Sequence, residues 1–135
     1  IQENNIKSRE VGSGMVGLRD IDFDSLIKDV KNKFNCGSIK YTPIINKKVK
    51  KIAVCGGSGS FLIKDAIRCG ADVFITSDFK YHDFFEANDQ ITLVDIGHYE
   101  SEQFTKDLIF EFLNKNLINI ALHLSNENTN PIKYF

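Results

Sequence analysis

His98 and Glu102 stand four residues apart, just after an apolar run, residues 91–96, that breaks at Gly97. The run predicts a strand, and the break predicts the start of a helix. Side chains at this spacing share one helix face, so an imidazole and a carboxylate can converge on one metal ion. A nitrogen and oxygen pair suits zinc, iron, manganese or nickel.

These two residues alone do not complete a site. A catalytic metal usually has three protein ligands and one open position, so other ligands must come from elsewhere. The alternative interpretation is a surface pair, which stabilises a helix by only about 0.2–0.5 kcal/mol.

Other polar residues follow predicted strands. Asp78 and His82 form a second corner of this kind, where Asp78 could bind a metal or cap the next helix. We expect a supporting role, in which His82 orients a substrate or shuttles a proton. Asp95 is expected to orient a neighbouring group. His123, inside the apolar run 118–124, is expected to be a structural histidine with its ring hydrogen-bonded.

The segment Gly56-Gly-Ser-Gly-Ser60 follows a predicted strand and opens a predicted helix. Its backbone N–H groups could hold a phosphate. However, it lacks the Gly-Lys-Ser/Thr ending of a nucleotide-binding loop, and Leu62 occupies the place of the third glycine of a dinucleotide fingerprint. The alternative is a tight turn that brings the backbone close to neighbouring elements.

Apolar patterns typical of strands and helices alternate from Lys51 onward. The expected strands are 51–55, 72–76, 91–96 and 118–124, and the expected helices are 61–69, 81–88 and 99–116. An entering strand or edge over 10–17, a helix from Phe23 to Phe34 and a strand over 38–42 are expected before them. The connection from Tyr41 to Lys51 is short enough for a hairpin or another short loop. We therefore expect a three-layer α/β domain with a mixed, mostly parallel sheet covered by helices.

Composition limits the function further. The chain has 135 residues, enough for one domain, with 42% hydrophobic and 26% charged residues and a net charge of -1. There is no basic excess, so nucleic-acid binding is not expected. Three widely spaced cysteines without a Cys-x-x-Cys motif predict a reducing, cytoplasmic setting, and no run is apolar enough to predict a membrane span. The first residue is Ile1 rather than methionine, which predicts an internal or truncated start.

Several motifs together resemble the NIF-three-like family, whose members are commonly labelled GTP cyclohydrolase I type 2 homologues. They are Val11-Gly-Ser-Gly-Met-Val-Gly17, Val54-Cys-Gly-Gly-Ser-Gly-Ser60, Ile75-Thr-Ser-Asp-Phe-Lys-Tyr-His82, Gly97-His-Tyr-Glu-Ser-Glu102 and Asn128-Thr-Asn-Pro-Ile132. The resemblance covers nearly the whole chain but only the second half of the family.

The resemblance implies two similar α/β halves that hold a pair of divalent metal ions, zinc, iron or manganese. Members of the family assemble as dimers and then as hexameric toroids. The first half supplies a His-His dyad and an aspartate, and the second half supplies the positions of His98 and Glu102. This chain has no His-His pair, and Met15 stands where the family usually has arginine. Residues 1–135 are thus expected to form one domain, the C-terminal half, with the N-terminal half absent.

Two functions follow from the resemblance and the residues. The first is a contribution to a dinuclear metal site of a hydrolase, of cyclohydrolase or phosphoester type, that acts on a small nucleotide. The second is a metal-binding or assembly module without turnover. The number of ligands and an open metal position would separate them.

Overall fold

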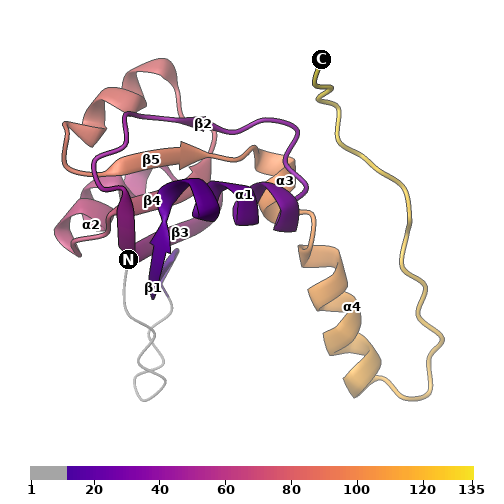
Figure 1. Cartoon of the computed structure of the whole chain (residues 1–135). Helices are drawn as coiled ribbons and strands as arrows, with labels where there is room; N and C mark the ends of the chain where they lie inside the picture. The colour runs from indigo at the N-terminus through magenta and orange to yellow at the C-terminus, as the bar shows by residue number, and fades with distance from the viewer. Residues whose placement is uncertain (1–11) are drawn as a thin grey trace.

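The computed structural model describes residues 12–135, so Glu10 and Val11 of the entering strand expected over 10–17 lie outside the described residues. One five-stranded sheet organises this part of the chain (Figure 1). Its strands are β1 (Met15–Asp22), β2 (Lys40–Tyr41), β3 (Lys48–Ser58), β4 (Val73–Ser77) and β5 (Thr92–Asp95). The helices are α1 (Phe23–Lys33), η1 (Ser60–Leu62), α2 (Ile63–Arg68), η2 (Tyr81–Ala87), α3 (His98–Glu102) and α4 (Thr105–Asn116).

The strand order is β1-β3-β4-β5-β2. The three central strands run parallel, and the two edge strands pair antiparallel with β3 and β5. Parallel strands need crossover connections, which α2 and η2 provide. The expected mixed α/β sheet is therefore confirmed, and the carboxyl ends of β3, β4 and β5 lie along one edge.

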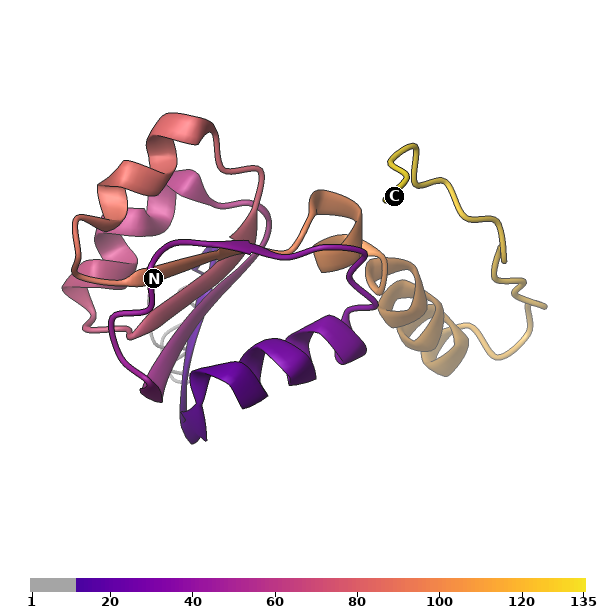
Figure 2. The same ribbon diagram turned by 45° about the horizontal axis from the view of Figure 1, so that its top comes forward.

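Helices cover both faces of the sheet because the buried strands are apolar on both sides. Phe74 and Leu93 point to the face that α2 and η2 cover, together with Ile63 of α2. Val73 and Val94 point to the opposite face, which α1 covers through residues such as Leu26. Figure 2 shows α1 on one side of the sheet and the two crossover helices, α2 and η2, on the opposite side. The three-layer expectation is thus confirmed.

The expected hairpin between Tyr41 and Lys51 is wrong. β2 pairs with β5 rather than with β3, whose free edge β1 already occupies. Side-chain hydroxyls hold the segment on β5, because the Leu93 N–H donates to Oγ1 of Thr42 at 2.9 Å and the Ile45 N–H donates to Oγ1 of Thr92 at 3.1 Å.

The expected single helix over 99–116 is also wrong. The chain leaves the helix at Gln103, whose side-chain amide donates to the carbonyl of Phe34 at 2.8 Å, and resumes as α4 at Thr105. Helix α4 extends away from the sheet and has no buried residue (Figures 1 and 2).

The expected strand over 118–124 is wrong, because these residues form no strand and pair with none of the five strands described. His123 is exposed there rather than structural. Within residues 12–135, no helix has the length and apolar character needed to cross a bilayer.

Candidate metal site

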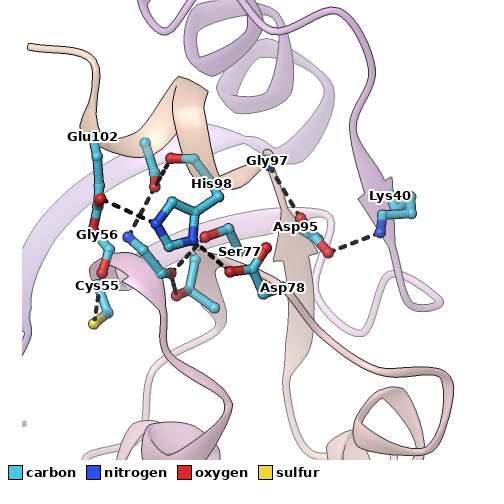
Figure 3. Close-up of polar contacts among 12 residues, drawn as sticks. Lys40, Cys55, Gly56, Ser77, Asp78, Asp95, Gly97, His98 and Glu102 are labelled. Atoms are coloured by element: carbon cyan, nitrogen blue, oxygen red, sulfur yellow. Dashed lines mark hydrogen bonds and ion pairs between the residues drawn. The ribbon is translucent and has the colours of Figure 1, made fainter. Parts of the chain in front are cut away.

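The candidate site lies at the carboxyl ends of the three parallel strands, where open α/β sheets place their chemistry. Asp78 directly follows β4, and His98 begins α3 two residues beyond Ile96, after β5 has ended. The glycine loop that closes β3 approaches them from the third strand. Figure 3 shows the ring of His98 between the carboxylates of Asp78 and Glu102.

Both ring nitrogens of His98 have carboxylate partners. Nδ1 lies 2.5 Å from Oδ2 of Asp78, and Nε2 lies 3.1 Å from Oε2 of Glu102. All three side chains are about half exposed, at 50%, 45% and 49%. The structure thus brings His98 and Glu102 onto one face, as their spacing predicts, and adds Asp78 behind the imidazole.

The hydrogen bond to Asp78 raises the pKa of His98 above its usual 6.5, and the charge of Glu102 acts in the same direction, whereas partial burial opposes it. A cation that binds Nε2 must displace a proton held more firmly than usual. The contact at Nδ1 fixes which nitrogen faces outward, as carboxylates do behind metal-binding histidines.

The glycine-rich carboxyl end of β3 forms a wall against Glu102. Gly57 has a φ of +65°, and a Cβ on it would lie 2.3 Å from Oε1 of Glu102. Its N–H donates to Oγ of Ser101 at 2.9 Å, and its carbonyl accepts from the hydroxyls of Thr76 at 2.9 Å and Ser77 at 2.6 Å. The N–H and the carbonyl of Gly57 both have hydrogen-bond partners within the protein, so this N–H is not free to bind a phosphate. The geometry favours the tight-turn interpretation over a phosphate cradle.

Asp95 acts on the backbone rather than on His98. Its carboxylate is 3% exposed, pairs with Lys40 at 2.9 Å and accepts from the N–H of Gly97 at 3.1 Å. Gly97 has a φ of +92°, where residues with a Cβ are strained. Asp95 thus holds the corner at which β5 turns into α3 and so positions His98.

His82 does not join this cluster. It is exposed on η2, and its ring lies 5.4 Å from that of Tyr81 and 6.4 Å from that of Phe85. Among the residues described, His82 does not contact His98. Its expected role beside a substrate therefore stays a prediction.

The C-terminal segment lines the same hollow as the two candidate ligands, although the residue spacing does not predict this. The hollow has a volume of about 500 Å³, and its walls include His98, Glu102 and Lys106 together with residues of the segment 127–132. Side-chain turns shape this segment, because Asn128 Oδ1 accepts from the N–H of residue 130 at 2.9 Å. In the sequence, only the motif over 128–132 indicates that this segment belongs to the site.

Two ligand atoms are present for a metal ion. Bonds of about 2.1 Å at angles of about 90–110° separate two donors by about 3.0–3.4 Å, and the 3.1 Å between His98 Nε2 and Glu102 Oε2 falls in this range. Between residues 12 and 135, no group of three or more His, Cys, Asp or Glu could hold an ion. Within the described residues, the pair therefore does not complete a metal site by itself.

The family model described as Duf34/NIF3 (NGG1p interacting factor 3) matches residues 1–131. The chain belongs to the DUF34/NIF3 family. A protein of Staphylococcus aureus (strain Mu50 / ATCC 700699) named GTP cyclohydrolase 1 type 2 homolog is 38% identical over 110 residues, 78% of this chain and 30% of that protein. A Staphylococcus epidermidis (strain ATCC 12228 / FDA PCI 1200) protein of the same name is 36% identical over 135 residues, 95% of this chain and 37% of that protein.

Solved structures of DUF34/NIF3 relatives share the fold. The crystal structure of Staphylococcus aureus protein SA1388 matches with a TM-score of 0.77 and 34% identity, over 90% of this chain and 42% of that chain. A Bacillus cereus protein related to NIF3 matches with a TM-score of 0.73 and 26% identity, over 89% of this chain and 35% of that chain. The DUF34/NIF3 chain described here thus spans well under half the length of the relatives it matches.

Proposed function

We propose that this DUF34/NIF3 domain contributes His98 and Glu102 to a dinuclear site for zinc, iron or manganese in a metal-dependent hydrolase that acts on a small nucleotide. The observation that carries the proposal is the 3.1 Å separation of His98 Nε2 and Glu102 Oε2 on the wall of one open hollow. The relatives' name, GTP cyclohydrolase 1 type 2 homolog, supports the reaction class for those proteins.

Each residue has a defined part in this proposal. His98 binds through neutral Nε2, and Asp78 holds the proton on Nδ1. Glu102 supplies negative charge, and the backbone of Gly57 limits where its carboxylate can lie. A bound metal pair would lower the pKa of a bound water and stabilise the charge that develops on the leaving oxygen.

A metal-binding or assembly module without turnover is the second candidate. The observation that favours it is that the described residues provide only two ligand atoms. The two functions differ in whether the complete site hydrolyses GTP or only binds metal.

We also propose that the protein works as a homo-oligomer, a dimer or a hexameric toroid, in the cytoplasm. The exposed apolar residues of α4 support an assembly surface, because Phe112 and Leu108 are each 66% exposed. The free state of all three cysteines supports a reducing compartment. Phe112→Asp should lower the sedimentation coefficient of the assembly, whereas Phe61→Asp, equally exposed on η1, should leave it unchanged. An assembly that resists Phe112→Asp would exclude α4 as the contact.

Calorimetric titration with zinc and manganese tests the metal site. The 135-residue chain should bind weakly, and addition of the remaining part of the S. epidermidis relative should give tight binding and GTP hydrolysis. His98→Ala and Glu102→Gln should each abolish that gain. The matched controls His123→Ala and Glu111→Gln change exposed residues away from the hollow and should not affect it.

Tight binding by the chain alone that survives both substitutions would show that the ligands lie elsewhere. Tight binding after complementation without GTP hydrolysis would favour the module without turnover.

A further inference from the structure

A second cavity, of about 540 Å³, lies at the β2 edge of the sheet, between the segment after β2 and helix η2. Four aromatic residues line it: Tyr41, Tyr81, Phe84 and Phe85. None of its lining residues also lines the hollow beside His98. Cavities of this size lined mainly by apolar and aromatic side chains are typical of small-molecule sites.

One of the aromatic side chains in the lining is packed against the core, and two others are exposed to solvent. Phe84 packs edge-on against buried Phe79 at a centroid distance of 5.3 Å. Tyr81 and Phe85, one helical turn apart and 5.4 Å between centroids, are 73% and 66% exposed. Buried Ile91 also lines the cavity. Rings that stay exposed around a hollow offer flat faces on which a planar ligand can stack.

Two polar side chains complete the lining at the turn between η2 and β5. Asn88 and Asp89 have φ values of +43° and +52°, two consecutive residues in the left-handed region. Asn and Asp tolerate this region, and Asn88 is the C-cap that ends η2. Across residues 12–135, neither side chain makes a recorded hydrogen bond to another residue of the chain, so both are available to a ligand. No lysine or arginine lines the cavity.

We propose that this cavity binds a planar nitrogen heterocycle that carries an amino group and no phosphate, with the size of a nucleoside. The aromatic faces stack on the ring, and the carboxylate of Asp89 accepts a hydrogen bond from the amino group. The negative charge of Asp89 disfavours a phosphorylated ligand, and the nearby Lys40, whose Nζ lies 6.0 Å from the centroid of Phe84, is paired with Asp95. The site is separate from the proposed metal site and does not depend on it.

Adenosine is the probe, titrated into the metal-free chain by calorimetry and by amide NMR. A ligand of its size at ordinary ligand efficiency should bind with a dissociation constant on the order of 0.1 mM. Purine riboside, which lacks the amino group, should bind about tenfold more weakly, and AMP should bind no more tightly than adenosine. Amide shifts should concentrate on residues 81–91.

Matched variants test the assignment. Phe85→Ala should weaken adenosine binding about tenfold, whereas Phe61→Ala, also 66% exposed but outside the cavity, should leave it unchanged. Asp89→Ala should remove the preference for adenosine over purine riboside.

Each of three results would overturn the inference: no saturable binding at millimolar adenosine, tighter binding of AMP, or equal weakening by both phenylalanine variants. Loss of adenosine binding in His98→Ala would also overturn it, because the ligand would then lie in the metal hollow. Failure of metal binding with normal adenosine binding would count only against the proposed hydrolase.

Discussion

Replacement of Gly57 by alanine should reduce stability for two separate reasons. The backbone has a φ of +65°, and the left-handed region costs a residue with a Cβ about 1–2 kcal/mol. The new Cβ would also lie 2.3 Å from Oε1 of Glu102, so the carboxylate must leave its present position. The displaced atom is the end of a half-exposed side chain, so its movement should add at most about 1 kcal/mol. We expect the free energy of unfolding to fall by about 1–3 kcal/mol.

Gly70 provides a matched control. Its φ is +71°, but a Cβ there would have nothing within 4 Å. Gly70→Ala should therefore show only the backbone cost, about 1–2 kcal/mol. Urea unfolding followed by circular dichroism measures both variants. The excess loss in Gly57→Ala over Gly70→Ala is the cost of moving Glu102.

The same pair of variants tests the metal site. Movement of Glu102 removes one proposed ligand and one of the charges that raise the pKa of His98. Gly57→Ala should lower that pKa in an NMR titration and weaken metal binding by the complemented protein at least tenfold, whereas Gly70→Ala should change neither. Equal effects of both variants would show that Glu102 does not contact the loop in solution. Loss of stability with unchanged metal affinity would show that Glu102 is not a ligand.

Three further outcomes follow from single contacts. Asp78→Asn should lower the pKa of His98, because the hydrogen bond that mainly raises it is weakened; an unchanged NMR titration would refute the contact. Asp72→Asn should cost about 1–2 kcal/mol at pH 7, since its carboxylate accepts from two backbone N–H groups at 2.8 and 2.9 Å. Burial raises the pKa of Asp72, but those bonds outweigh it, so the native pKa lies below 3.8 and the stabilisation is lost as pH falls through it; a pH-independent cost in urea unfolding would contradict this. Tyr134→Phe should lower the free energy of unfolding by about 1–2 kcal/mol, because the Tyr134 hydroxyl donates to buried Glu100 at 3.0 Å. Burial and the Glu100 carboxylate raise the pKa of Tyr134 to about 12. An unchanged unfolding midpoint would exclude that contact in solution.

The sequence predicted those features that depend on local spacing. The four-residue separation of His98 and Glu102 places both on one turn of helix, whatever the helix packs against. The alternation of apolar runs after Lys51 identified β3, β4 and β5, because strands buried on both faces are almost entirely apolar. The candidate site could be located from the His98–Glu102 spacing and the apolar runs, since the carboxyl ends of parallel strands lie on the same side of a sheet.

Features that depend on distant partners were not predictable in this way. The alternation near Tyr41 predicts a strand but not its neighbour, and side-chain hydroxyls on β5 selected the opposite edge of the sheet. The helical pattern over 99–116 contains no glycine or proline to mark the break at Gln103, which a hydrogen bond to the carbonyl of Phe34 accompanies. The apolar run 118–124 has strand composition, yet it follows α4 away from the sheet and pairs with no strand among the described residues.

The contact between His98 and Glu102 is also easily exchanged for a cation. An exposed pair of this kind contributes at most about 1 kcal/mol, because solvent screens the charges, so little is lost when the two side chains turn toward a shared ion. The proton on Nε2 is the larger obstacle, since Asp78 and Glu102 both raise the pKa of His98. Asp78 has two opposing effects. It orients the imidazole of His98 toward a metal ion, but it also raises the pKa of His98, so that a proton competes more strongly with the metal. Metal affinity should therefore rise with pH until His98 is neutral, and Asp78→Asn should move that rise to lower pH.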